Sequence, residues 1–178
     1  IFKTKPEVII ETGVCWGGST LLYNSLSKEL PIKKIIGIDI YIPSNLKKRL
    51  EKKCGKKLLL INGDSTDKKI VDRIKKITRK FKKFYIHLDS NHSFEHVYKE
   101  LKIYSKFLKK DNYIIASDTI VNEIPKQVHR PREWNKKNNP MIAVEKFIKN
   151  NYNFAIDKRI NYKQLISSNP NAYIRKIK

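Results

Sequence analysis

The chain has 178 residues, the length of one domain, and 40% of them are hydrophobic, as is ordinary for a globular protein. Its 39 basic and 17 acidic residues give a formal net charge of +22. No apolar run approaches the length of about 18 residues that a membrane-spanning helix needs, and no signal-peptide pattern opens the chain, so the sequence predicts no transmembrane helix.

Short β-like runs alternate with amphipathic, helix-length segments along most of the chain. Five apolar runs rich in Ile, Leu, Val or Tyr predict buried strands, at 8–14, 34–40, 57–62, 84–89 and 113–118. Helical spacing of apolar residues predicts helices between them, at 19–30, 44–53, 67–82 and 94–109. Repeated strand–helix units imply an α/β fold with a parallel sheet and helices on both faces.

The end of the chain departs from this alternation. Pro140 predicts the first turn of a helix over 141–150. Apolar runs at 154–159 and 172–178 predict two more strands, with a turn at 167–171 and no helix between them. We therefore expect the sheet to close with an antiparallel hairpin.

The first predicted strand leads into a glycine-rich loop. In an open parallel sheet, ligands bind beyond the carboxyl ends of the strands. Gly13, Gly17 and Gly18 permit tight turns and a close backbone approach to a ligand. The helix that begins near Ser19 offers free N–H groups to a carboxylate, and Glu11 at the strand end would pair with an amino group.

Acids also stand at the ends of the next strands. Asp39 closes the second strand, 21 residues after Gly18, which is about the spacing of an acid that accepts the ribose hydroxyls in nucleotide-binding folds. After the third strand, Asp64 and Ser65 are candidates to hydrogen-bond an adenine. The alternative is that the glycines make turns and the acids cap helices. Taken as a set, the residues favour a site for an adenosine-containing cofactor.

A second cluster is expected where the fourth and fifth strands end. Asp89 and Asp118 would hold a hard divalent cation through carboxylate oxygens. His92 follows Asp89 by three residues, and an imidazole there would take a proton from a substrate hydroxyl near neutral pH. The alternative for His92 is a loop or capping role, and for His96 that structural role is favoured.

The stretch 119–140 is long for a loop in a compact domain. It contains Arg130, Arg132 and Trp134, which suit an anionic or sugar substrate. A lid that binds substrate and an irregular surface loop are both consistent with this pattern.

The positive charge raises the question of a polyanionic partner. Lysines outnumber arginines 32 to 7 and are spread over nearly every predicted helix. That distribution is typical of solvated faces, whereas phosphate-binding sites favour the bidentate guanidinium of Arg. Nucleic acid is therefore a less favoured partner than a small-molecule or glycan acceptor. The cysteines, Cys15 and Cys54, show no pairing or metal-site pattern, which indicates a reducing, cytoplasmic setting.

Several strings resemble one family from about Thr4 to Lys178. They are IIETGVCWGGSTLLY, IGIDI, INGDS, HLDSNHSFEHVYKELKIYS, YIIASDTIVN and the tail AVEKFIKNNYNFAID to SSNPNAYIRKIK. The chain resembles the cephalosporin hydroxylase / rhamnosyl O-methyltransferase family. The resemblance implies a Rossmann-like class I methyltransferase fold with a mostly parallel, seven-stranded sheet, S-adenosylmethionine as cofactor, and often Mg²⁺. It also implies a single domain over 1–178, lacking the N-terminal helical segment usual in the family.

The resemblance assigns roles as well. Related macrolide-sugar O-methyltransferases carry Asp-x-x-His, with the Asp on the metal and the His as base, and Asp89 and His92 match that pattern. The family's next ligands are an adjacent Glu-Asp pair, and this chain departs from it with Ser117 and Asp118. We therefore predict an S-adenosylmethionine-dependent O-methyltransferase that acts on a hydroxyl of a sugar, polysaccharide or secondary metabolite.

Three other functions stay open at this point. The basic surface suits a nucleic-acid-binding protein or an RNA-modifying methyltransferase. His92, His96 and Asp89 supply the ligand types of a non-haem iron hydroxylase. Ser117 is consistent with a non-catalytic partner subunit. Homo-oligomer formation is open too.

Overall fold

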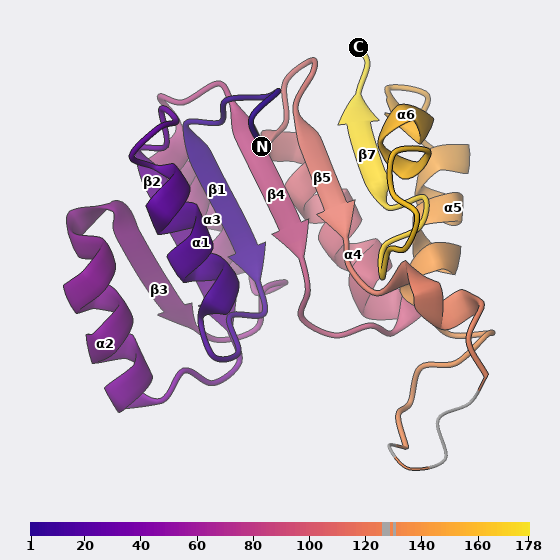
Figure 1. Ribbon diagram of the computed structural model, residues 1–178, viewed down its shortest axis with the longest axis horizontal. Coiled ribbons are helices and arrows are strands. Elements are labelled where there is room, and N and C mark those ends of the chain that lie inside the picture. The colour runs from indigo at the N-terminus through magenta and orange to yellow at the C-terminus, as the bar shows by residue number, and fades with distance from the viewer. Residues whose placement is uncertain (126–128, 130) are drawn as a thin grey trace.

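The computed structural model describes residues 1–125, 129 and 131–178. Its centre is a seven-stranded sheet in the order β3-β2-β1-β4-β5-β7-β6 (Figure 1). The strands are β1 Val8–Thr12, β2 Lys34–Asp39, β3 Leu58–Asn62, β4 Phe84–Leu88, β5 Tyr113–Ala116, β6 Phe154–Ile156 and β7 Tyr173–Lys176. The pairs from β3 to β5 are parallel, whereas β7 runs antiparallel to both β5 and β6.

Helices connect the strands. They are α1 Gly18–Leu26, α2 Ser44–Cys54, α3 Lys68–Thr78, α4 Phe94–Tyr104, α5 Pro140–Lys149 and α6 Lys158–Asn161, with short 3-10 helices η1 Gly55–Lys57, η2 Ser105–Phe107 and η3 Thr119–Asn122. Two starts have a clear chemical cause. The Asp67 carboxylate accepts hydrogen bonds from the first amides of α3, and the Asn139 side chain does the same for α5, where Pro140 occupies the first turn.

The helices form a layer on each face of the sheet. Alternate residues of a strand point to opposite faces, so the buried Ile9 packs towards α1 and α2 while its neighbour Ile10 packs towards α3, α4 and α5. The same alternation recurs at Ile35 and Ile36 of β2. Both residues of each pair are fully buried, which explains why these strands read as continuous apolar runs.

The predicted fold class is confirmed, with one local correction. The prediction that no helix separates the two closing strands is wrong, because α6 lies between β6 and β7. The run at 154–159 stops being a strand at Ile156. The next residue, Asp157, turns the chain by accepting hydrogen bonds from the backbone and side chain of Arg159. The two strands still pair antiparallel.

The two ends of the chain lie at one edge of the sheet. β1 starts at that edge and the antiparallel β7 ends there, so the markers of both termini stand opposite the carboxyl ends of the parallel strands (Figure 1). In the parts of the chain described above, the helices are all too short or too polar to cross a membrane.

Candidate active site

The glycine loop joins the end of β1 to the start of α1. Gly13 and Gly17 have φ values of 84° and 78°, a backbone conformation that side chains disfavour. A Cβ at Gly13 would clash with the carbonyl oxygen of Asp89, so this residue also lets the loop touch the end of β4. Gly18, by contrast, faces open space, with no atom within 4 Å of where its Cβ would stand. The N-terminus of α1 has no side-chain cap, so its first amides are available to a ligand.

Asp39, at the end of β2, contacts this loop through its side chain. Its Oδ2 accepts hydrogen bonds from the amides of Val14 at 2.8 Å and Cys15 at 3.0 Å, and its Oδ1 accepts one from Tyr41 at 3.2 Å. The carboxylate is partly exposed. The structure therefore brings the predicted acid of the second strand directly against the predicted loop of the first.

Glu11 lies beneath the loop and is only 1% exposed. Its Oε2 accepts a hydrogen bond from Thr20 at 2.9 Å, and its Oε1 lies 3.5 Å from His87 Nδ1. Within the described residues, Oε1 has no hydrogen-bond partner. A buried carboxylate oxygen without a donor is costly, which marks this atom as one that a ligand would complete.

Asp64 and Ser65 follow β3, but their side chains are already engaged. Asp64 Oδ1 accepts hydrogen bonds from the amide and hydroxyl of Thr66, at 2.7 and 2.8 Å. The buried Ser65 hydroxyl donates to Glu100 at 2.5 Å. Asp64 is exposed at this end of β3, whereas the Ser65 hydroxyl, predicted to face an adenine, is buried against Glu100.

Glu100 is a buried residue that no sequence pattern singled out. It lies on α4, is fully buried, and accepts hydrogen bonds from both Ser65 and Ser90, so it ties the loop after β3 to the loop after β4. His96 Nε2 stands 3.4 Å from the same carboxylate oxygen. Burial lowers the pKa of His96, but the hydrogen bond and charge of Glu100 outweigh it, so the pKa lies above its ordinary value. His96 therefore belongs to the polar network around Glu100.

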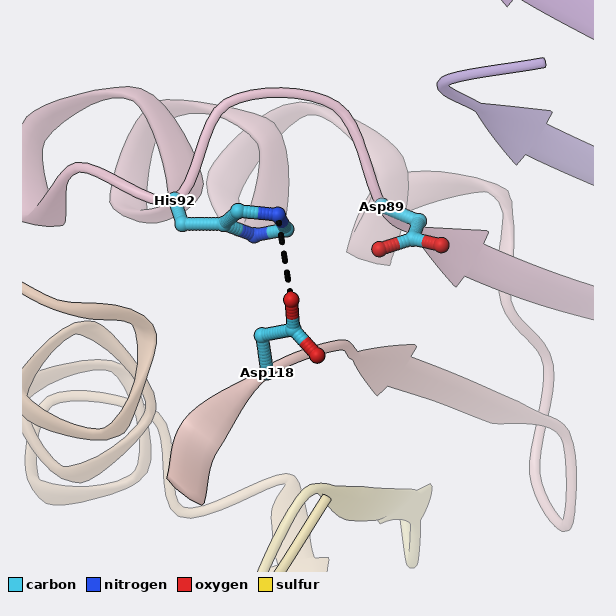
Figure 2. Close-up of side chains that lie close together, drawn as sticks. All are labelled: Asp89, His92 and Asp118. Carbon is cyan, nitrogen blue, oxygen red and sulfur yellow. Dashed lines mark ion pairs between the residues drawn. The ribbon is translucent and has the colours of Figure 1, made fainter. Parts of the chain in front are cut away.

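Asp89, His92 and Asp118 converge where β4 and β5 end (Figure 2). One ligand atom from each lies within 4.8 Å of the other two, and His92 Nε2 is 3.4 Å from Asp118 Oδ2. Asp118 has a φ of 55°, a left-handed conformation that Asp and Asn tolerate better than most residues. The backbone amide of Asp118 donates a hydrogen bond to Asn169 Oδ1, which stabilises the turn after β5. The fold thus brings Asp118, at the end of β5, beside Asp89 and His92, which follow β4.

Burial and neighbouring carboxylates raise the cost of ionising Asp89 in this cluster. Burial raises the pKa of Asp89, and the nearby carboxylates of Asp118 and Glu11 raise it further, against the opposing influence of His87 and His92. Two carboxylates held close together in a partly buried place repel each other. A bound cation would relieve that repulsion.

The cluster opens into a cavity of about 520 Å³. The cavity is lined by His92, Asp118, Ile120, Val121, Ile124, Pro125, Arg132, Trp134, Asn135, Lys136 and Lys137. The Trp134 ring meets the His92 ring edge to face at 5.1 Å. Two of the predicted substrate residues, Arg132 and Trp134, therefore lie beside the predicted base. The third, Arg130, lies outside the described residues.

A family model described as Rhamnosyl O-methyltransferase/CmcI matches residues 1–177. The chain belongs to this family. A rhamnosyl O-methyltransferase of Mycobacterium bovis is 27% identical over 128 residues, which cover 69% of this chain and 50% of that protein. A rhamnosyl O-methyltransferase of Mycobacterium leprae is 26% identical over 129 residues, covering 70% and 54%. The chain spans about half the length of these curated relatives.

Solved structures support the fold of this Rhamnosyl O-methyltransferase/CmcI member. The MycE methyltransferase from the mycinamycin biosynthetic pathway, in complex with Mg and SAH, has a TM-score of 0.58 and 17% identity, covering 97% of this chain and 45% of that one. The O-methyltransferase TomG from Streptomyces achromogenes, in complex with SAM, also has a TM-score of 0.58, at 12% identity, covering 86% and 66%. At these identities the similarity concerns the fold.

Ser117 is where this Rhamnosyl O-methyltransferase/CmcI member departs from the predicted Glu-Asp pair. The structure places its hydroxyl 2.7 Å from His87 Nε2, and the other ring nitrogen of His87 is 2.9 Å from the Tyr23 hydroxyl. His87 thus stands between Ser117 and Glu11. Sequence reasoning missed His87 and Tyr23. The only available signal was a histidine within the otherwise apolar strand FYIHL.

Proposed function

We propose that this domain transfers a methyl group from S-adenosylmethionine to a hydroxyl of a sugar-bearing acceptor, with Asp89 and Asp118 as metal ligands and His92 as general base. The carrying observation is the position of the Asp89, His92 and Asp118 cluster, between the glycine loop on one side and the lined cavity on the other. The curated relatives named rhamnosyl O-methyltransferase support a sugar hydroxyl as the acceptor group.

The residues of the glycine loop fit S-adenosylmethionine. Glu11 Oε1, buried and without a hydrogen-bond donor, matches the cofactor's ammonium group. The uncapped amides at the start of α1 match its carboxylate. Asp39, partly exposed at the end of β2, matches the ribose hydroxyls. The ammonium group, the carboxylate and the ribose hydroxyls of the ligand would therefore each have a complementary group at this edge.

The cluster at β4 and β5 fits a hard divalent cation. Two carboxylates at adjacent strand ends supply oxygen donors, which Mg²⁺ prefers, and Asp89 gains a partner for a charge that burial disfavours. When bound, such a cation would hold vicinal hydroxyls of the acceptor and lower the pKa of the reacting one.

In this proposal, His92 takes the proton of that hydroxyl. Its Nε2 points towards Asp118 (Figure 2). The edge-to-face contact with Trp134 restricts the ring on the cavity side. The ring borders the cavity where an acceptor would lie. A general base at this position contributes about 10²–10⁴-fold to the rate.

Two substitutions separate cofactor binding from chemistry. We expect Asp39→Ala to weaken binding of S-adenosylhomocysteine, measured by calorimetry, because the ribose hydroxyls lose their acceptor and the loop amides lose theirs. We expect His92→Ala to bind S-adenosylhomocysteine as the wild type does but to turn over about 100-fold more slowly. Unchanged turnover in His92→Ala would rule out the assigned base.

A further inference from the structure

The cavity beside the cluster has two chemically different walls. Ile120, Val121, Ile124 and Pro125, in and just after η3, form an apolar side. Arg132, Lys136 and Lys137 supply cations on the other. Asp118 is the one acid among the described lining residues, and it belongs to the proposed metal site. The acceptor cavity is therefore positively charged.

Among the described residues, no acid forms an ion pair with the cations of this wall, Arg132, Lys136 and Lys137. The nearest acids in sequence, Glu123 and Glu133, are exposed and do not line the cavity. Cations gathered around a concave space attract an anion more strongly than the same charges spread over a convex surface.

Trp134 links the cationic wall to the base. The guanidinium of Arg132 lies over its ring, 5.2 Å from the centroid, while His92 meets the same ring at 5.1 Å. Arg132 and His92 are thus no further apart than these two distances together. One acceptor molecule can reach both groups, with its reacting hydroxyl at His92 and another substituent at Arg132.

The cationic wall is held in place by asparagine hydrogen bonds. Asn135 and Asn138 pair through their backbones, and Asn138 Oδ1 accepts a hydrogen bond from Phe94 at the start of α4, at 2.8 Å. The fully buried Asn139 donates to Asn122 of η3 and to the Asn135 carbonyl. The segment that carries the cations is therefore fastened to the elements that carry His92 and Asp118.

From this arrangement we infer that the acceptor sugar carries an anionic substituent, a phosphate or a carboxylate, which Arg132, Lys136 and Lys137 bind while His92 faces the reacting hydroxyl. The inference rests on the proposed function and narrows its substrate class. The planar guanidinium suits either anion through paired hydrogen bonds, with the two ammonium groups adding charge. The apolar wall would receive the carbon skeleton of the acceptor.

Calorimetry with three sugars tests this inference. Methyl α-L-rhamnoside, α-L-rhamnose 1-phosphate and glucuronate are each titrated into the wild-type domain, with and without S-adenosylhomocysteine and Mg²⁺. We expect at least one anionic sugar to bind about tenfold or more tightly than the neutral one, with a preference that shrinks as NaCl rises from about 0.05 M to about 0.5 M. Whichever anionic sugar binds more tightly identifies the substituent.

Two variants connect that preference to the cavity. Arg132→Met, and separately the double variant Lys136→Met with Lys137→Met, should each reduce the preference about tenfold while binding S-adenosylhomocysteine normally. The matched control, Lys75→Met with Lys76→Met, lies in the last turn of α3, where neither lysine lines the cavity, and should leave the preference unchanged. This control removes as much charge as the double variant but none of it from the cavity.

The contrary outcomes are distinct. Equal binding of neutral and anionic sugars, or no binding of any of them, would overturn the anionic acceptor while normal S-adenosylhomocysteine binding keeps the proposed function intact. A preference that the control pair lowers as much as the cavity pair would also overturn it, because the effect would then belong to the overall charge. Failure of S-adenosylhomocysteine to bind would count against the proposed function itself.

Discussion

The proposed cofactor side and the proposed acceptor side of the site differ in the kinds of groups that line them. On the proposed cofactor side, the polar groups are backbone amides and side chains near the strand ends, and Glu11 and Thr20 are almost wholly buried. On the acceptor side, they come from long side chains of the segment that follows β5, and Arg132, Lys136 and Lys137 are all exposed. The first side is positioned by the sheet, and the second by hydrogen bonds between loops.

This difference suits two kinds of ligand. The register of the sheet sets Glu11 opposite Gly37 and His87, so the cofactor side has little freedom to change shape. Such rigidity is appropriate for a reactant that is always the same. Exposed side chains on a fastened loop can be exchanged without disturbing the core, which is appropriate for selecting an acceptor.

The sharpest test of a rigid cofactor side is Gly13→Ala. The added methyl group meets the Asp89 carbonyl, and the φ of 84° is strained for alanine, so the loop must move. We expect S-adenosylhomocysteine binding to weaken by about 100-fold and the free energy of unfolding to fall by about 3 kcal/mol. Calorimetry and urea unfolding measure the two effects. Gly18→Ala, which meets no atom within 4 Å, is the stability control and should unfold as the wild type does.

Glu100 tests whether the two sides depend on each other. Glu100→Leu leaves the hydroxyls of Ser65 and Ser90 without their acceptor, and we expect a loss of about 3 kcal/mol of unfolding free energy. Glu100→Gln keeps an acceptor oxygen and should lose about 1 kcal/mol. A loss in Glu100→Leu no larger than in Glu100→Gln would mean that the two loops hold their positions without this residue.

The same network predicts a pH dependence. The folded-state pKa of His96 is above its ordinary value, so its stabilising interaction with Glu100 is complete below about pH 6.5 and is lost as the pH rises through the folded-state pKa. Urea unfolding of the wild type between about pH 6 and 9 should show this decline. Glu100→Gln removes the charge that raises the pKa and should flatten the curve, and an equal decline in both proteins would contradict the assignment.

Asp118→Asn separates charge from backbone conformation at the metal cluster. Asparagine also adopts the left-handed conformation, so we expect the unfolding free energy without metal to change by less than about 1 kcal/mol. We expect Mg²⁺ to raise the thermal unfolding temperature of the wild type and not that of Asp118→Asn, because the variant lacks one of the two proposed carboxylate ligands. Persistence of the full Mg²⁺ effect would remove Asp118 from the metal site.

The last prediction concerns the acceptor side. Asn138→Ala removes the hydrogen bond to the first amide of α4 and should cost about 1 kcal/mol of unfolding free energy. Binding of S-adenosylhomocysteine should not change, while binding of the acceptor sugar should weaken. If cofactor binding fell as well, the two sides would not be as separate as their construction indicates.

The sequence predicts the site residues at the strand ends better than the polar residues inside helices and strands. Continuous apolar runs predict a parallel sheet that is buried on both faces. Acids that follow such runs must lie at the same edge of that sheet. The positions of Asp39, Asp89 and Asp118 could therefore be predicted from the sequence. Those of His87 and Glu100 could not, because a polar residue inside an element shows its partners only once the elements have packed. Asn138 was missed for a related reason, since its partner Phe94 is 44 residues away.

The position of the chain ends has a practical consequence. Ile1 and Lys178 lie at the edge of the sheet opposite the glycine loop and the cavity (Figure 1). A purification tag, a fluorescent fusion or a surface linker attached at either end would leave the site facing solution. The domain can therefore be immobilised for acceptor screening from either end, in the same orientation, without covering the face under test.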